Sequence, residues 1–569
     1  MTSSSLASVL AALSLAASAA AQTQILSNEA PNSDVLRGAA VAGGYDFNGD
    51  GFDDLVIGTP KADTGGKTDN GFVQVISGQT GAVLQQKVGD NSNDQFGSAV
   101  AITGDVDNDG VRDVIVGAPF AINGGGVQTG MARVFSGATG ANLHSFYGIA
   151  AGDRFGDSVD GGFDTNGDGF GDVIFGAPEG DNGALNNAGY FTTYSGANGA
   201  QLLRRFGSSS SDNVGFAVAG VGDLNGDGQR DFVVGSPGEA SNGRVRAWSG
   251  LSTNATPVQL WQVTGDSLGD DFGCALAGQL DVDNDGISDV LVGARGADSP
   301  GATDSGLVRA LRGTNGNAVF SAYGLVASER LGHSVAVIGN IDNLAGREII
   351  AGSVSLGLAR VFDPTNDELL ITVTGTSSLN QLGFAVADAG DLNNDGVRDF
   401  AVGEPFFDGP GLTNNGRVVV YSGTPWVARY CTAGTSSNGC VPTINWSGAP
   451  RASSASGFLL TASGLEGQKS GLFFYGLSGR QETPWGASTS FLCVKAPTQR
   501  CNVLNTAGTA GSCNGFFVFD WLAYRTANPS SLGATLTVGE LVQTQGWYRD
   551  PPSPKTTHLT GALEFLVGP

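Results

Sequence analysis

Short hydrophobic runs recur along most of the chain and alternate with segments rich in Gly, Asn and Asp. Examples are VIVG at 114–117, ARVFSG at 132–137 and ANLHSF at 141–146, which are bounded by Gly, Asn and Pro. Runs of this length and composition predict strands joined by tight turns, and no stretch shows a convincing amphipathic helical period. The pattern therefore predicts an all-β protein.

The runs repeat as a unit of about 59 residues. Each unit contains one short acidic loop between its first and second runs, and these loops begin at Asp46, Asp105, Asp164, Asp223, Asp281, Asn340 and Asp391. Four short strands per unit form the antiparallel meander of a propeller blade. We therefore expect a seven-bladed β-propeller over residues 22–424.

Three motifs keep one order in these units: Phe-Gly, the acidic loop DxDxDGxxD, and Gly-Ala-Pro. Phe-Gly stands at 96–97, 155–156 and 272–273 and is altered to Leu-Gly at 331–332, while Gly-Ala-Pro stands at 117–119 and 176–178, with variants at 58–60, 235–237 and 403–405. In this order the motifs resemble the FG-GAP repeats of integrin-α-type propellers. The resemblance implies a closed ring used for adhesion or ligand binding.

A closed ring has to cover the edges of its first and last blades. The last unit ends at residues 416–423 without the outer strand that follows in other units, and TQIL at 23–26 precedes the first unit. We therefore predict that residues 23–27 complete the seventh blade.

The acidic loop of the second unit has the residue types of a calcium site. Asp105, Asp107, Asp109 and Asp113 occupy positions 1, 3, 5 and 9, with Gly at position 6 and the carbonyl of Val111 at position 7. Calcium takes 6–8 oxygen ligands, and a Gly at position 6 allows the sharp turn that directs alternate side chains to one point. This loop therefore predicts a Ca²⁺ site.

The same pattern predicts about six Ca²⁺ sites. The side-chain ligands expected in the other five loops are Asp46, Asn48, Asp50, Asp54, Asp164, Asn166, Asp168, Asp172, Asp223, Asn225, Asp227, Asp231, Asp281, Asp283, Asp285, Asp289, Asp391, Asn393, Asp395 and Asp399. Their position-7 carbonyls belong to Phe52, Phe170, Gln229, Ile287 and Val397. The loop of the sixth unit, NIDNLAGRE, has Leu344 at position 5, so we expect no calcium there.

Two other interpretations of these loops are weaker. An EF-hand requires Glu at position 12 and flanking helices, but position 12 here is Ile, Val or Phe within a strand-forming run. Asn, Asp and Gly also occur in ordinary turns, yet six loops in register favour a metal site. Six divalent ions would change the formal net charge from −25 to about −13.

That acidic charge, Lys+Arg 29 against Asp+Glu 54, argues against nucleic-acid or anionic-membrane partners. Residues 6–21 are small and apolar and end in Ala-Ala-Ala, which predicts a signal peptide over 1–21 and a secreted or cell-surface protein, extracellular or periplasmic. A membrane anchor is the competing interpretation, but the run is shorter than a span. We expect no membrane insertion.

The last quarter of the chain, 430–569, differs in composition and contains five of the six cysteines. Its apolar runs predict a small β-sandwich-like domain, which faintly resembles a C-terminal module of secreted bacterial repeat proteins. Clustered cysteines in an exported protein favour disulfides, with Cys431–Cys440 the expected pair. Cys274 stands alone in the repeats and is expected to be buried.

The sequence contains no nucleophile elbow, phosphate loop or zinc motif. His333 is expected to be a packed histidine rather than a catalytic one. We therefore expect a secreted, calcium-binding, non-catalytic propeller for adhesion or ligand binding, with calcium mainly structural and an unknown protein or glycan as its ligand. The alternatives are a carbohydrate-binding, lectin-like propeller and an extracellular polysaccharide lyase or hydrolase.

Overall fold

The computed structural model describes residues 24–250, 258–341, 346–365, 367–394, 397–423, 427–431, 433–447, 450, 452, 454–485, 490–532, 540–550 and 557–567. The predicted signal peptide, 1–21, lies outside these ranges. Contacts separate the chain into two units, Gln22–Thr424 and Pro425–Pro569. Each unit is described by itself.

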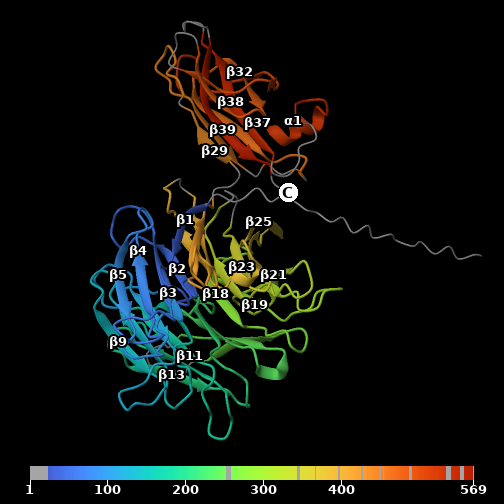
Figure 1. The fold of residues 1–569 in the computed structure, drawn as a ribbon. Coiled ribbons are helices and arrows are strands. Elements are labelled where there is room, and N and C mark those ends of the chain that lie inside the picture. The colour runs from blue at the N-terminus through green and yellow to red at the C-terminus, as the bar shows by residue number, and fades with distance from the viewer. Residues whose placement is uncertain are drawn as a thin grey trace, which may run out of the picture. The chain divides into compact units, whose positions relative to one another are not determined.

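The first unit consists of four-stranded antiparallel sheets, here numbered 1 to 7 in chain order (Figure 1). Sheets 1 to 3 contain β2 (Ala40–Tyr45), β3 (Asp54–Thr59), β4 (Phe72–Ile76) and β5 (Val83–Val88); β6 (Ala99–Ile102), β7 (Val114–Ala118), β8 (Met131–Phe135) and β9 (Asn142–Tyr147); and β10 (Ser158–Phe163), β11 (Asp172–Ala177), β12 (Tyr190–Tyr194) and β13 (Gln201–Phe206).

Sheets 4 to 6 contain β14 (Ala217–Gly220), β15 (Phe232–Ser236), β16 (Arg244–Trp248) and β17 (Gln259–Thr264); β18 (Ala275–Leu280), β19 (Asp289–Ala294), β20 (Leu307–Leu311) and β21 (Ala318–Tyr323); and β22 (Ser334–Val337), β23 (Ile349–Ser353), β24 (Leu358–Asp363) and β25 (Glu368–Thr374). Sheet 7 contains β26 (Val386–Gly390), β27 (Asp399–Glu404), β28 (Arg417–Tyr421) and β1 (Gln24–Glu29).

The first strands of successive sheets contact one another. These contacts run from β2 through β6, β10, β14, β18 and β22 to β26, and β26 contacts β2 in turn. The second strand of each sheet is buried along its whole length, which places the cores between neighbouring sheets. The predicted all-β propeller fold is confirmed.

The strand at the N-terminus completes the last sheet. β1 pairs antiparallel with β28, with Gln24 opposite Tyr421 and Glu29 opposite Arg417 (Figure 1). The prediction made for residues 23–27 is therefore confirmed from Gln24 onward, Thr23 lies outside the described residues, and the strand continues to Glu29. This pairing covers the edge of β28 that would otherwise be open.

Glycines make the closest contacts between neighbouring sheets. A Cβ placed on Gly117, at the end of β7, would lie 2.0 Å from the carbonyl oxygen of Gly156 in the next unit. Gly156 has a φ of 84°, which only glycine adopts without strain. The Gly of Gly-Ala-Pro in one unit therefore contacts the Gly of Phe-Gly in the next unit.

The same contact occurs at every joint between sheets. The glycine pairs are Gly58–Gly97, Gly117–Gly156, Gly176–Gly215, Gly235–Gly273, Gly293–Gly332, Gly352–Gly383 and Gly403–Gly38, with the added Cβ 1.8–2.1 Å from the opposite carbonyl oxygen. The Phe-Gly motif did not identify Gly38, Gly215 and Gly383. The residues before them are Arg37, Val214 and Leu382, where other units have Phe. The last pair joins sheet 7 to sheet 1.

The second unit contains two main sheets and one short helix. Its elements are β29 (Val427–Tyr430), β30 (Thr443–Ser447), β31 (Leu459–Leu465), β32 (Ser470–Gly476), β33 (Arg480–Pro484), β34 (Phe491–Val494), β35 (Thr498–Arg500), β36 (Leu504–Asn505), β37 (Gly515–Asp520), α1 (Trp521–Ala527), β38 (Leu541–Arg549) and β39 (Thr557–Leu566). A shared core containing Phe458, Phe473, Trp521 and Phe565 packs the β30–β31–β37 sheet against the sheet of β32, β38 and β39.

Helix α1 was not expected from the sequence. The run GFFVFDW at 515–521 predicts one strand, but the strand ends at Asp520, whose carboxylate accepts the amide of Ala523 and begins the helix. No helix among the described residues is long and apolar enough to cross a membrane.

The predicted Cys431–Cys440 disulfide is wrong. Cys431 pairs with Cys493, and Cys440 pairs with Cys513. The chain after Cys440 enters β30, which pairs with β31, and β31 also pairs with β37, the strand that follows Cys513. Strand pairing, rather than short spacing in the sequence, therefore selects the partners.

The glycine contacts predict a specific effect of one methyl group. Gly117→Ala should lower the free energy of unfolding by about 2 kcal/mol or more, because the added carbon clashes with backbone that cannot move independently. The matched control is Gly124→Ala on an exposed loop, where an added Cβ meets nothing within 4 Å. Denaturant unfolding of both variants in calcium measures the difference, and equal stability would contradict the packing account.

Candidate metal centres

The candidate calcium loops occupy the same place in each sheet, between its first and second strands. Because neighbouring strands are antiparallel, these loops lie at one edge of the sheets, and the segments joining second to third strands lie at the opposite edge. In the second loop Asp105, Asp107 and Asp109 are partly or fully exposed, whereas Asp113 is fully buried.

The position-1 carboxylate organises the turn. Asp46 accepts hydrogen bonds from the amides of Gly49, Asp50 and Gly51 at 2.7–3.3 Å. Equivalent bonds are made by Asp105, Asp164, Asp223 and Asp281. These bonds wrap the backbone around the position where a cation would sit.

Two residues of each of the first five turns, and position 4 of the seventh, adopt the left-handed region. Position 6 was recognised in the sequence, but position 4 also has positive φ in all six loops. The position-4 residues are Gly49, Asn108, Gly167, Gly226, Asn284 and Asn394. Their restriction to Gly and Asn is a signal that sequence reasoning missed, since these residues tolerate positive φ best.

The side chains at positions 1, 3 and 5 converge. In the second and fifth loops, one carboxylate oxygen from each of the three aspartates lies within 4.8 Å of the others. Two oxygens that each lie about 2.4 Å from one Ca²⁺ are at most about 4.8 Å apart. The residues therefore fit a single hard cation, which these carboxylates would hold.

The Asn-containing loops share this arrangement. Asn48 Nδ2 donates to Asp50 Oδ2 at 2.9 Å, and Asn166–Asp168 and Asn225–Asp227 repeat the bond. The amide of each position-7 residue from Phe52 to Ile287 donates to the position-5 carboxylate. The carbonyls of these residues remain predicted ligands.

The fifth loop contains a competing charge. Arg312 Nε lies 2.5 Å from Asp283 Oδ2. In the second and third loops the equivalent residues are Ser136 and Ser195, whose hydroxyls donate to the position-5 aspartate at 3.3 and 3.2 Å. A guanidinium beside a ligand opposes a second cation, so the fifth loop is a poorer calcium site than the second.

The position-9 aspartate has a structural role that the sequence did not reveal. Asp113 Oδ2 accepts the amide of Val106 at 2.6 Å, and its Oδ1 accepts the amide of Gly137, after β8, at 3.0 Å. The same two bonds are made by Asp54, Asp172, Asp231, Asp289 and Asp399, all fully buried. The carboxylate thus ties the loop to the third strand.

Burial raises the pKa of Asp113 to about 6 and of Asp54, Asp172, Asp231 and Asp289 to the same value. A cation bound nearby would favour the ionised form and oppose this shift. Because an ionised carboxylate offers about four lone-pair sites, it can accept two amides and still bind a metal.

The sixth loop keeps one of these two bonds without the acidic pattern. Glu348, at position 9, is 2 % exposed, and its Oε2 accepts the amide of Ile341 at 2.7 Å. Pro364 stands where the other sheets have a Gly N–H after the third strand. The substituted residue, Leu344, lies outside the described residues. The buried carboxylate is therefore used even where calcium binding is not expected.

The seventh loop is described in part. Asp391, Asn393, Val397 and Asp399 lie within the described ranges, and Asp395 lies outside them. Leu392 donates its amide to Asp399 Oδ2 at 2.8 Å, as in the other loops.

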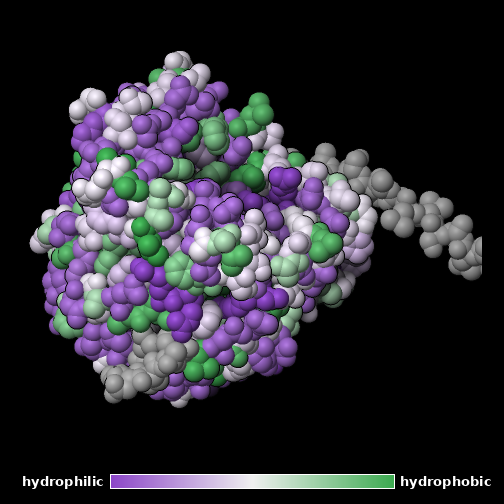
Figure 2. All heavy atoms as spheres, turned by 90° about the horizontal axis from the view of Figure 1, so that it is seen from below, coloured by the Kyte–Doolittle hydropathy of each residue, from purple (hydrophilic) through white to green (hydrophobic). Residues whose placement is uncertain are grey.

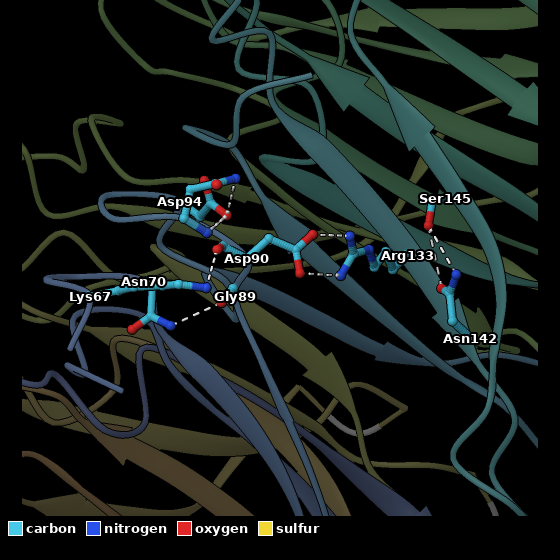
Figure 3. A network of polar contacts seen from close by, with 9 residues as sticks. Lys67, Asn70, Gly89, Asp90, Asp94, Arg133, Asn142 and Ser145 are labelled. Atoms are coloured by element: carbon cyan, nitrogen blue, oxygen red, sulfur yellow. Dashed lines mark hydrogen bonds and ion pairs between the residues drawn. The ribbon is translucent and has the colours of Figure 1, made fainter. Parts of the chain in front are cut away.

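The segments at the opposite edge differ in sequence but are held by hydrogen bonds of their own. In sheet 1, Asn70 Nδ2 donates to the carbonyl of Gly89 at 2.9 Å, and Lys67 contacts the carbonyl of Asp90 (Figure 3). Figure 3 also shows the ion pair between Asp90 and Arg133. These contacts order the edge that faces away from the acidic loops.

Two residues considered for chemistry are packed in the propeller. Cys274 is 7 % exposed, and burial raises the pKa of its thiol to about 11. Burial lowers the pKa of His333 to about 4, and its ring lies 5.2 Å from that of Phe384. Neither residue is placed as a nucleophile or base.

A Ser–His–Asp arrangement in the second unit was also missed. Ser490 Oγ lies 2.8 Å from His558 Nδ1, and His558 Nε2 lies 3.4 Å from Asp550 Oδ2. All three residues are at most 2 % exposed. A substrate cannot reach this serine in the described structure, so the arrangement is a buried polar cluster.

Comparison with known proteins agrees with the repeat structure. The family model described as "FG-GAP repeat" matches residues 37–76, 96–135, 214–248 and 385–421. These segments coincide with the first three strands of sheets 1, 2, 4 and 7.

The chain is also similar to integrin alpha chains. It is 33 % identical to integrin alpha-V of Gallus gallus over 216 residues, which are 36 % of this chain and 20 % of that protein. It is 29 % identical to integrin alpha-8 of Gallus gallus over 270 residues, and 31 % identical to integrin alpha-PS2 of Drosophila melanogaster over 231 residues. These matches cover 46 % and 36 % of this chain, but only 20 % and 16 % of those relatives. The chain therefore carries FG-GAP repeats, and its propeller is similar to the repeat region of integrin alpha chains.

Proposed function

We propose that this protein is a calcium-binding, non-catalytic propeller for adhesion or ligand binding, in which about six calcium ions are mainly structural. The observation that carries the proposal is the convergence of three carboxylates in the second and fifth loops, in a sequence pattern that recurs in four further loops. All donors in these loops are oxygens, the ligand type that calcium prefers.

A structural role for calcium follows from the position of the loops. Each loop is fixed to its own sheet through the buried position-9 carboxylate, as Asp113 is through Val106 and Gly137. A cation bound by the same loop would neutralise the neighbouring aspartates, which otherwise repel one another. Calcium would therefore fasten the first two strands of each sheet except the sixth.

The ligand-binding surface is proposed at the opposite edge. The segments 61–71, 120–130, 179–189 and 406–416 differ from sheet to sheet, and loops on a rigid scaffold commonly carry recognition. Figure 2 shows one face of the molecule, which is mainly hydrophilic with scattered hydrophobic residues. The two disulfides favour an oxidising compartment, in keeping with a secreted or cell-surface protein.

Removal of calcium should destabilise the propeller. In excess chelator the melting temperature should fall by about 5 °C or more, because each site filled at 100 times its Kd contributes about 2.7 kcal/mol. Differential scanning calorimetry in calcium, in magnesium and in chelator measures the effect. An unfolding transition that is unchanged by chelator would refute the structural role.

Two matched substitutions distinguish the structural hydrogen bonds of Asp113 from metal binding by the loop. Asp113→Asn should lower the melting temperature in calcium and in chelator alike, because one buried amide loses its acceptor at a cost of about 1–3 kcal/mol. Asp107→Asn should have a small effect, seen only in calcium, since Asn48, Asn166 and Asn225 fill this position in other loops. If Asp113→Asn is harmless in chelator, the carboxylate acts only as a metal ligand.

A further inference from the structure

The second unit contains a cavity of about 220 Å³ that is separate from its main core. Because side chains alternate along a strand, Phe473 of β32 lies in the core, whereas its neighbours Leu472 and Phe474 line the cavity. Leu472 lies opposite Trp547 on β38, and Trp547 lies opposite Leu559 on β39. Three adjacent strands therefore form an apolar floor.

The opposite wall comes from the hairpin of β33 and β34, which contributes Leu492 and Trp485. Trp485 Nε1 donates to Thr557 Oγ1, on β39, at 3.1 Å. A disulfide joins Cys493, in β34, to Cys431, which follows β29 of the main sheet. The hairpin is thus attached to the sheet at two points, and the cavity is formed before any ligand binds. A preformed site loses little conformational freedom on binding.

Two aromatic side chains of the cavity lack aromatic neighbours. Phe473 packs against Phe517 and Phe519, with ring centroids at 5.1 and 5.8 Å. Phe474 and Trp547, on the other face of the sheet, form no such ring pair within the described part of the chain. Aromatic rings favour offset or edge-to-face contacts with other rings. A planar aromatic ligand in the cavity would supply these contacts.

The size and lining of the cavity limit the ligand. A cavity of roughly 150 Å³ accommodates benzene, so the 220 Å³ here corresponds to a body of roughly nine carbon atoms. The polar side chains in the lining are Gln481, Thr498 and Arg500. Gln481 Nε2 already donates to the carbonyl of Val494 at 3.0 Å. An apolar lining with so few polar groups suits a hydrocarbon body better than a sugar.

A positive charge lies at the open side of the cavity. Arg500 is opposite Phe474 in the pairing of β35 with β32. Arg500 is exposed, as are Ala496 and Thr498, so the cavity reaches solvent here. Its guanidinium forms no hydrogen bond or ion pair with a described residue. Residues 425–569 contain nine Lys and Arg against six Asp and Glu, although the whole chain is strongly acidic. A free guanidinium can bind a carboxylate through two parallel N–H bonds.

We propose that this cavity binds a planar aromatic carboxylic acid of about two fused rings. The rings would insert between the sheet and the hairpin, against Trp547 and Leu492. The carboxylate would remain at the opening and accept hydrogen bonds from Arg500. This site goes beyond the proposed function of the propeller, since it lies within the second unit and uses no residue of the acidic loops.

Isothermal titration of the full chain with 2-naphthoate should detect a single site. 2-Naphthol has the same rings without the carboxylate, and it should bind about fivefold more weakly or worse. Decanoate carries the carboxylate on a flexible chain of similar size. It should also bind at least about fivefold more weakly than 2-naphthoate, because it loses more conformational entropy and makes no ring contact.

Variants assign the binding to this cavity. Arg500→Gln should weaken 2-naphthoate binding about fivefold or more and leave 2-naphthol binding unchanged. Lys495→Gln removes the same charge from an exposed residue outside the lining, so both ligands should bind it as they bind the parent chain. Thr498→Trp places a large side chain at the opening and should weaken both ligands. The melting temperature of each variant shows whether it is folded.

The proposal is overturned if 2-naphthoate does not bind, or if Arg500→Gln binds it as tightly as the parent chain. Unchanged binding by a folded Thr498→Trp variant would also exclude this cavity as the site. Decanoate binding as tightly as 2-naphthoate would overturn the aromatic ligand class. None of these results bears on calcium binding, because the cavity shares no residue with the acidic loops.

Discussion

The packing of neighbouring sheets depends on a short backbone contact between two glycines. The Gly of each Gly-Ala-Pro element, such as Gly117, faces the carbonyl of the Phe-Gly glycine in the next unit, and Gly403 faces Gly38 across the last joint. Any side chain there would force the sheets apart and open the cores between them. This contact explains why the two glycines recur in every unit although the Phe, Ala and Pro beside them vary.

The acidic loops depend on this packing and add to it. Buried position-9 carboxylates, such as Asp113, bind one amide of the loop and one after the third strand, so each loop is anchored inside its sheet before any metal is considered. Calcium would bind the exposed carboxylates at positions 1, 3 and 5 of the same loop. Glu348 keeps the bond to the loop amide in the sheet whose loop lacks the acidic pattern, although Pro364 offers no N–H after the third strand.

Much of this architecture could be predicted because the turns and strands of each repeat are determined by residues that are near in sequence. Position 6 of the loops, the strand runs and the pairing of β1 with β28 all follow from residues near in sequence or from the need to cover an edge. Three features could not be predicted: the disulfide partners, helix α1 and the hydrogen bonds of the buried Asp113. They depend on which strands lie next to one another in the fold.

Calcium binding by the acidic loops as a set is the property on which the proposed function rests. Elemental analysis of the full chain after exhaustive dialysis against micromolar calcium, with protein counted by amino-acid analysis, tests it most directly. The account predicts about six calcium ions per chain, or about five if Arg312 excludes the ion from the fifth loop. A chain that retains none or one would contradict it.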